Sequence, residues 1–160
     1  MHSLLRTLTF TALLTDAIPI TSLSAQATDA ALGTWKLNVA KSRYEPGPAP
    51  KEQTLLYEAA GRAVRITSQT VDPQGTNVII QYSATYDGRD YPVSGGVDFD
   101  TTSLKLIDPF TVEGTRKLAG RVVQTFTRVV SNDRKTLTIT TTGTNARGQR
   151  VDNVVIYERQ

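Results

Sequence analysis

The sequence predicts an all-β domain, most simply an antiparallel up-and-down barrel of about ten strands. From Gly33 onward apolar and polar residues alternate with a period of two, and turn residues recur about every eight to twelve positions. No stretch keeps a helical periodicity over 12 residues. A two-sheet β-sandwich is the main alternative. We favour the barrel because nearly every connection is short enough for a hairpin, and closure hides the edge strands.

The first 27 residues have the features of a secretory signal peptide. Arg6 supplies positive charge, residues 4–14 form an apolar stretch, and Ala25-Gln26-Ala27 provides the small residues of a cleavage site. The alternative is a disordered or loosely helical tail. The apolar stretch is too short to span a bilayer, so we expect no stable membrane insertion. The predicted organisation is a leader at residues 1–27 and one barrel domain at residues 28–160, secreted or periplasmic.

The mature region contains neither an imidazole nor a thiol, because the only histidine, His2, lies in the leader and there is no cysteine. This excludes Ser-His-Asp and Cys-His catalysis, most zinc sites, a histidine-ligated haem and any disulfide. We therefore predict no catalytic residue, no metal and no cofactor, although carboxylate, Lys or Tyr chemistry stays possible. The net charge of +3 is spread along the chain, which does not indicate nucleic-acid binding. We also expect a monomer.

The first strand is expected at residues 34–39, with Trp35, Leu37 and Val39 on the inner face. Residues 41–51 follow, where prolines alternate with Gly47 and Ala49 and favour an extended course. This segment is either a plain surface connection or a flap over the barrel mouth.

The other strands are separated by turns rich in Gly, Pro, Asp and Asn, such as Asp72-Pro73-Gln74-Gly75 and Asp87-Gly88. They are expected at residues 54–60, 63–71, 77–86, 90–93, 103–107, 111–117, 121–130, 136–142 and 150–159.

The opening segment Leu32-Gly33-Thr34-Trp35-Lys36-Leu37-Asn38 resembles the Gly-x-Trp opening of the lipocalin and fatty-acid-binding-protein superfamily, the calycins. The Tyr157-Glu158-Arg159 ending is similar to that of fatty-acid-binding proteins. The likeness is closer to small exported bacterial lipocalin-like proteins of uncharacterised function, and further segments carry it: residues 33–38, 44–50, 86–93 and 143–146. The resemblance implies an up-and-down barrel with Trp35 at its closed base.

Two departures limit what this resemblance implies. The two-helix lid of fatty-acid-binding proteins is replaced here by the proline-rich segment 41–51. Their Arg-x-Tyr on the last strand corresponds to Val155-Ile156-Tyr157, in which only the Tyr remains.

A barrel of about ten strands has room for one small ligand. Alternation within each strand places a set of large, mostly aromatic side chains on the inner face: Trp35, Leu37, Tyr57, Ile66, Tyr82, Tyr86, Phe126, Val155 and Tyr157. Each could equally be ordinary core packing. The tyrosines favour an amphipathic ligand over a pure hydrocarbon, because a buried phenol needs a hydrogen-bond partner.

Arg128 shares the alternation of Val122, Gln124, Phe126 and Val130, so it points inward if Phe126 does. It could bind an anionic head group, or it could pair with an acid at the barrel rim.

Three hypotheses follow. The leading one is a non-catalytic barrel that binds a small hydrophobic or amphipathic molecule through Trp35, Tyr57, Ile66, Tyr82, Tyr86, Phe126, Arg128 and Tyr157. The second is a filled barrel that contacts an envelope component or a protein partner. The third is an isomerase or cyclase of the lipocalin-like kind, which would need an inward acid such as Asp98, Asp100 or Glu113 beside a Tyr.

Overall fold

The computed structural model describes residues 29–160, which form ten antiparallel β-strands in one sheet. The predicted leader at residues 1–27 lies outside the described residues. The elements in order are β1 (Gly33–Leu37), the 3-10 turn η1 (Val39–Lys41), β2 (Glu52–Ala60), β3 (Ala63–Val71), β4 (Asn77–Ala84), β5 (Tyr91–Pro92), β6 (Thr101–Asp108), β7 (Thr111–Leu118), β8 (Arg121–Val130), β9 (Thr136–Thr144) and β10 (Arg150–Arg159). In the described part of the chain, no helix is long and apolar enough to cross a membrane.

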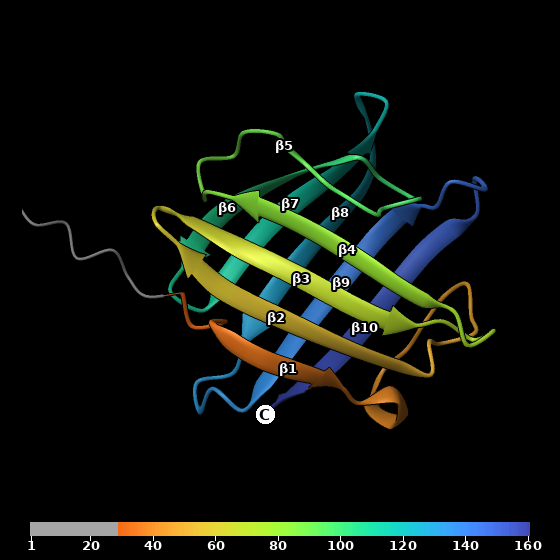
Figure 1. Cartoon of the computed structure of the whole chain (residues 1–160), viewed down its shortest axis with the longest axis horizontal. Coiled ribbons are helices and arrows are strands. Elements are labelled where there is room, and N and C mark those ends of the chain that lie inside the picture. The colour runs from red at the N-terminus through yellow and green to blue at the C-terminus, as the bar shows by residue number, and fades with distance from the viewer. Residues whose placement is uncertain (1–28) are drawn as a thin grey trace, which may run out of the picture.

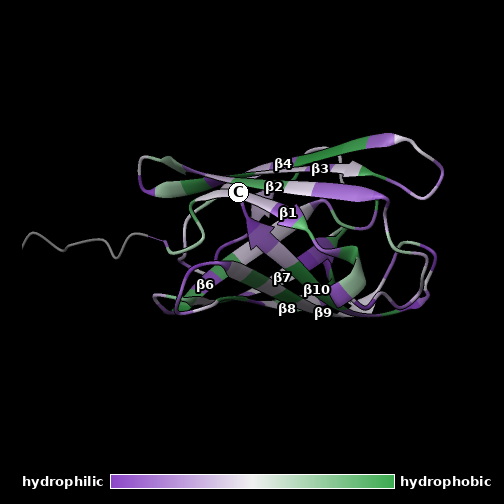
Figure 2. Cartoon of the chain, turned by 90° about the horizontal axis from the view of Figure 1, so that it is seen from below, coloured by the Kyte–Doolittle hydropathy of each residue, from purple (hydrophilic) through white to green (hydrophobic). Residues whose placement is uncertain are grey.

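The sheet order is β4-β3-β2-β1-β10-β9-β8-β7-β6-β5, so every strand except the ends of the order lies between neighbours (Figure 1). The first and last strands of the chain pair through β1 and β10, where Trp35 lies opposite Arg159. Seen from the side, β1 to β4 form one wall and β6 to β10 the other (Figure 2). The predicted barrel is confirmed, and the two-sheet sandwich is not what the chain adopts.

The two ends of the sheet order, β4 and β5, meet where only a few backbone hydrogen bonds close the barrel. Gln81 on β4 and Ser94 exchange two backbone hydrogen bonds of 3.0 and 2.9 Å. Asp87 forms a second isolated bridge with Lys105 on β6. We call this line of contacts the seam. It makes the barrel nearly closed, because few backbone bonds cross it, whereas β2 and β3 pair along their whole length from Glu52 to Ala60.

The two ends of the barrel differ. Residues 29–32, the turn at residues 61–62 and the C-terminus lie at one end, which we call the base end (Figure 1). The loops at residues 42–51, 72–76 and 145–149 lie at the other, which we call the loop end.

Two local features depart from the predicted alternation. Val39 was predicted to face the core, but it begins the 3-10 turn and is 42% exposed. The Asn38 side chain accepts a hydrogen bond from the Lys41 backbone, which favours the turn over a longer strand. Val122 was predicted to share the inner face of Phe126, but a register shift opposite it turns it outward, to 57% exposure.

Candidate functional site

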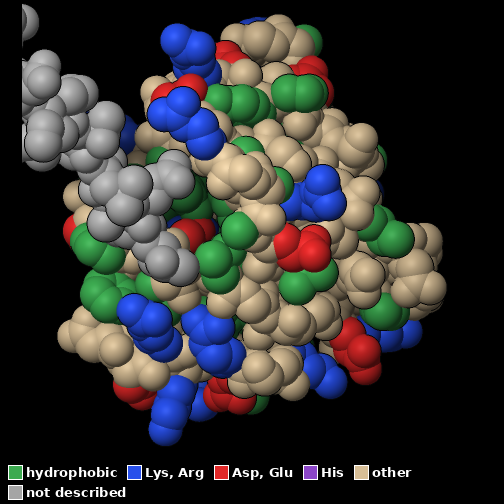
Figure 3. Space-filling model, turned by 60° about the vertical axis from the view of Figure 1, so that its left-hand side comes forward, with side chains coloured by type: hydrophobic (Ala, Val, Ile, Leu, Met, Phe, Trp, Pro, Cys, Tyr) green, Lys and Arg blue, Asp and Glu red, His purple; other side chains and the backbone are tan. Residues whose placement is uncertain are grey.

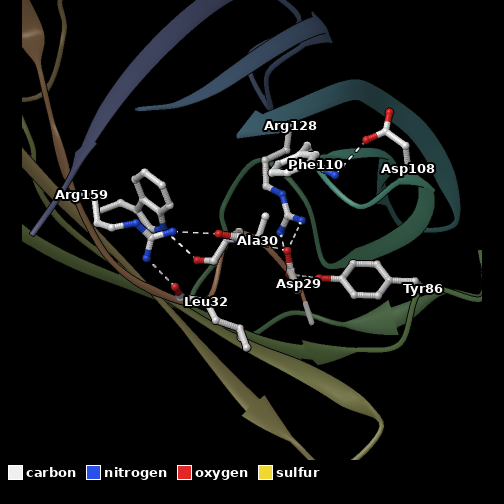
Figure 4. Close-up of polar contacts among 10 residues, drawn as sticks. Asp29, Ala30, Leu32, Tyr86, Asp108, Phe110, Arg128 and Arg159 are labelled. Atoms are coloured by element: carbon white, nitrogen blue, oxygen red, sulfur yellow. Dashed lines mark hydrogen bonds and ion pairs between the residues drawn. The ribbon is translucent and has the colours of Figure 1, made fainter. Parts of the chain in front are cut away.

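Arg128 is buried at the base end and is neutralised by Asp29. Their side chains are 3% and 7% exposed, and the guanidinium donates to both carboxylate oxygens, at 2.8 and 3.2 Å (Figure 4). The Tyr86 hydroxyl donates to the same carboxylate. Burial raises the pKa of Tyr86, so the phenol stays neutral and remains a donor. The carboxylate therefore occupies the face of Arg128 that an anionic ligand would need.

Trp35 closes the base end beside this pair. Its indole N–H donates to the Ala31 carbonyl at 2.7 Å, and the Arg159 guanidinium lies 4.2 Å from the centre of a Trp35 ring. Arg159 also donates to the Leu32 and Ala30 carbonyls at 2.7 and 2.8 Å (Figure 4). These contacts fix residues 29–32 across the barrel end. The position of Trp35 is the one that the calycin resemblance implied.

A different set of polar side chains lies inside the barrel toward the loop end. We call it the inner polar cluster, and its members are Gln53, Ser68, Thr70, Arg116, Gln124 and Tyr157. Tyr157 donates to the Gln53 amide oxygen at 2.7 Å, and the Gln53 amide nitrogen lies 2.9 Å from Ser68 Oγ and 3.0 Å from Thr70 Oγ1. Strands β2, β3 and β10 bring these groups together: Gln53 lies opposite Thr70, and β1, which lies between β2 and β10, has Leu37 opposite Tyr157.

Arg116 completes the cluster from β7. Its guanidinium lies 4.6 Å from the ring centre of Phe99 and 4.7 Å from that of Phe126. One N–H donates to the Gln124 amide oxygen at 3.0 Å, and Gln124 in turn donates to the Thr144 carbonyl. Burial lowers the pKa of Arg116, although a guanidinium stays charged in any protein environment.

Accessible surface inside the barrel changes from one end to the other. Near the base end the inward side chains of Trp35, Val112, Val130 and Leu137 are at most 1% exposed. Toward the loop end, Arg116 and the inward residues of the opposite wall keep partial exposure: Gln53, Thr70, Val78 and Ile80. Tyr82 is also partly exposed, but it lies near the base-end terminus of β4 and lines the hollow along the seam. Burial raises its pKa. The interior is thus tightly packed around Trp35, whereas inward side chains of β2, β3, β4 and β7 keep some accessible surface toward the loop end.

The proline-rich segment 41–51 is attached to the barrel wall at the loop end. Arg43 bridges Val154 on β10, and the Glu45 carbonyl accepts from the Asp152 backbone at 2.8 Å. Tyr44 between them packs against the core, and its hydroxyl is buried without a partner among residues 29–160. The segment therefore covers part of the loop end with an aromatic side chain.

Three hollows lie elsewhere on the barrel. A hollow of about 710 Å³ opens at the base end, and hydrophobic side chains gather near this end in Figure 3. Its lining combines Leu32, Val64 and Leu106 with polar groups of Tyr86 and Tyr91. A groove of about 420 Å³ on the outer face of β6 to β9 is lined mainly by Ser and Thr. A smaller hollow of about 290 Å³ follows the seam.

The structure brings most of the sequence-predicted lining residues to the interior. Tyr57, Ile66, Phe126, Val155 and Tyr157 are at most 7% exposed and belong to one core cluster with Trp35 and Leu37, and Tyr82 and Tyr86 pack against it. They do not all share one space. Trp35, Tyr86 and Arg128 belong to the base end, Tyr82 lines the hollow along the seam, and Tyr157 belongs to the inner polar cluster.

Asp29 and Arg116 are functional candidates that the sequence reading missed. Asp29 lies 99 residues from Arg128 and precedes the first strand, so no local pattern marks it. Arg116 does carry a signal, because it shares the alternation of Val112 and Gly114, which face the core.

None of the three acids considered for catalysis is hydrogen-bonded to a tyrosine within residues 29–160. Asp98 accepts from the Ala146 backbone and Asp100 from the Ala119 backbone, and the latter bond lowers the pKa of Asp100. Glu113 lines the outer groove. Within residues 29–160, no group of three or more His, Cys, Asp or Glu side chains could hold a metal ion.

The calycin resemblance implied an up-and-down barrel with a Gly-x-Trp first strand and the Trp at a closed end. The structure has this arrangement. The fold is of the calycin type. No protein-family model matches the chain, and no curated protein sequence matches it. Among solved structures, the chain is similar to zebrafish ileal bile acid-binding protein complexed with cholic acid. The two chains are 17% identical with a TM-score of 0.49, and the match covers 82% of this chain and 99% of that one.

Proposed function

We propose that this chain is an exported, monomeric barrel protein that binds a small hydrophobic or amphipathic molecule inside the half of the barrel nearest the loop end, without catalysing a reaction. The change in interior packing carries the proposal. Inward side chains around Trp35 are sealed, whereas inward residues toward the loop end keep accessible surface, at Ile80 and Arg116 among others. An interior with space in one half suits a ligand better than a barrel filled throughout.

The lining of this half has the composition of a small-molecule site. Phe99, Phe126 and Ile66 supply buried apolar walls, and the inner polar cluster supplies a few convergent polar groups. Apolar walls with a small number of placed polar groups orient an amphipathic molecule.

A binding role is favoured over a catalytic one by the positions of the acids. Asp98 and Asp100 accept hydrogen bonds from backbone groups and Glu113 lines the outer groove, so none of the three has the contact with a tyrosine that the catalytic hypothesis requires. Export is supported by the leader features of residues 1–27.

Native mass spectrometry tests the proposal. The full chain should be expressed with its leader, collected from the exported fraction and purified without detergent or organic solvent. We expect a mature chain beginning at Thr28 that carries an additional small mass, which is lost after denaturation and solvent extraction. A ligand-free chain that binds no member of a lipid and sterol panel would contradict the proposal and favour the filled interaction barrel.

A further inference from the structure

The hollow of about 710 Å³ at the base end lies where β2 and β3 approach β6, away from the side that Trp35 seals between β1 and β10. The end of β2 shows that this space continues the line of inward side chains. Ala59 shares the alternation of Leu55 and Tyr57, which are buried, yet Ala59 is exposed and lines the hollow. The base end is therefore packed on one side and open on the other.

The walls of this hollow are mainly apolar. Four large side chains pack against the core cluster but remain only half-buried where they line the hollow: Leu32, Tyr86, Tyr91 and Leu106. They come from four segments of the chain, so the fold and not one local motif creates the space. Volumes of roughly 300–1,000 Å³ with apolar and aromatic walls are typical of small-molecule sites.

The charges on the inner side of the hollow neutralise each other. Asp29 lines the hollow, and both of its carboxylate oxygens accept hydrogen bonds from Arg128 (Figure 4). The Tyr86 hydroxyl donates to the same carboxylate. An ion placed against this neutral group would lose hydration and meet no opposite free charge, so this side of the hollow suits an uncharged ligand.

Hydrogen-bond acceptors gather at the edge of the hollow. The Tyr91 hydroxyl donates to the Asp87 carboxylate at 2.9 Å and lies 2.5 Å from Thr85 Oγ1. The Arg89 backbone N–H donates to the other Asp87 oxygen at 3.0 Å. A carboxylate has roughly four acceptor sites, so Asp87 is held in place and can still accept a hydrogen bond from a ligand.

The geometry points to a binding site in this hollow for a compact neutral molecule that has an apolar body and a hydroxyl group that donates to Asp87. An anionic head group would meet the Asp87 carboxylate, and a cationic one would meet Arg62, which lines the hollow, and Arg89, whose Nε lies 3.8 Å from Asp87. The site lies at the opposite end of the barrel from the half assigned under the proposed function. It therefore stands independently of that function.

Nuclear magnetic resonance titrations with three probes of one ring system test this site. The probes are 2-naphthol, naphthalene and 2-naphthoate, added to the unaltered chain, to Ala59→Leu, to Asp87→Asn and to the control Ala146→Leu. Ala146 is exposed between β9 and β10, so it gives the same increase in volume outside the hollow. We expect 2-naphthol to shift the amide signals of Ala59, Val64 and Leu106. It should bind at least about tenfold more tightly than the other two probes, because its hydroxyl donates to a carboxylate.

The variants should separate the space from the polar contact. Ala59→Leu fills part of the hollow and should weaken 2-naphthol binding at least about tenfold, whereas Ala146→Leu should leave it unchanged. Asp87→Asn removes the negative charge, so it should reduce the preference for 2-naphthol over 2-naphthoate.

Equal binding of 2-naphthoate and 2-naphthol by the unaltered chain would overturn the neutral-ligand assignment. Unaltered 2-naphthol binding in Ala59→Leu, or shifts confined to Gln53, Arg116 and Gln124, would overturn the site itself. Binding of none of the three probes would also overturn it and would leave the proposed function to its own test by native mass spectrometry. Should Ala59→Leu not fold, the positions of the shifts in the unaltered chain and the Asp87→Asn comparison still decide.

Discussion

The guanidinium of Arg159, the last residue of β10, lies 4.2 Å from the centre of a ring of Trp35 on the first strand. The same side chain donates to the Leu32 and Ala30 carbonyls, so one cation joins both ends of the chain at the base of the barrel. A Cβ at Gly33 would come within 2.7 Å of Arg159 Nη1, which explains the glycine of the Gly-x-Trp segment. The base end is thus fixed by an interaction between the chain termini of the barrel domain.

Replacing Arg159 by Lys should destabilise the barrel by about 2 kcal/mol, because Lys cannot stack in a plane or reach both carbonyls at once. Urea unfolding followed by Trp35 fluorescence measures the change. Arg150→Lys is the control, since Arg150 makes only an exposed ion pair with Asp152 and should have little effect. Equal losses in the two variants would show that the stacking over Trp35 contributes nothing specific.

Removing the carboxylate partner of Arg128 should destabilise the fold more than Arg159→Lys does. Asp29→Asn leaves a buried guanidinium without its carboxylate, which we expect to destabilise the fold by about 3–5 kcal/mol. The double variant Asp29→Asn with Arg128→Met removes the charge as well and should recover part of the loss. A double-mutant cycle from denaturant unfolding measures the coupling. Additive effects of the two substitutions would contradict a tight pair.

The free energy of unfolding should fall at alkaline pH. Burial raises the pKa of Tyr57, Tyr82 and Tyr157 above the ordinary value in the unfolded chain, about 10. Above about pH 10 the unfolded chain releases phenol protons that the folded chain keeps. The stability that these buried tyrosines contribute is therefore complete below about pH 10 and is lost as pH rises toward their raised pKa values. Unfolding midpoints measured across this range should fall.

Tyr82→Phe offers a control for this pH dependence. The Tyr82 hydroxyl has no hydrogen-bond partner in residues 29–160, so the substitution should leave stability at neutral pH nearly unchanged and reduce the alkaline loss. An identical alkaline profile in Tyr82→Phe would exclude this residue as a contributor.

The seam between β4 and residues 93–96 should open when Gly95 is replaced. Gly95 has φ +77°, and a Cβ there would collide with the Ile79 carbonyl oxygen. We expect Gly95→Ala to destabilise by about 1–3 kcal/mol and to speed hydrogen exchange at the Gln81 and Ser94 amides. Gly61→Ala shares the positive φ but meets open space, so it should cost less and leave seam exchange unaltered.

Strand positions and inward faces were predictable because both depend on local alternation and turn residues. The ten expected strands correspond to β1 to β10, and the buried positions of Tyr57, Ile66, Phe126 and Tyr157 follow from the same pattern. The reversal at Val122 could not be predicted, since it depends on a bulge set by pairing with the neighbouring strand.

The partners of buried charges were the main part of the site that the sequence did not reveal. The alternation that placed Arg128 inside says nothing of Asp29, which approaches through the tertiary fold from 99 residues away. Arg116 was accessible to the same reasoning through Val112 and Gly114. Its unpaired state, however, depends on which acids the fold brings near, and this only the three-dimensional arrangement shows.

Chemical-shift mapping with decanoate shows whether a small molecule binds inside the barrel toward the loop end. In a titration followed by nuclear magnetic resonance, we expect the largest changes at Gln53, Arg116 and Gln124. Changes confined to the outer groove at Thr125, Thr127, Thr140 and Thr142, or to the hollow at the base end, would contradict binding inside this half of the barrel.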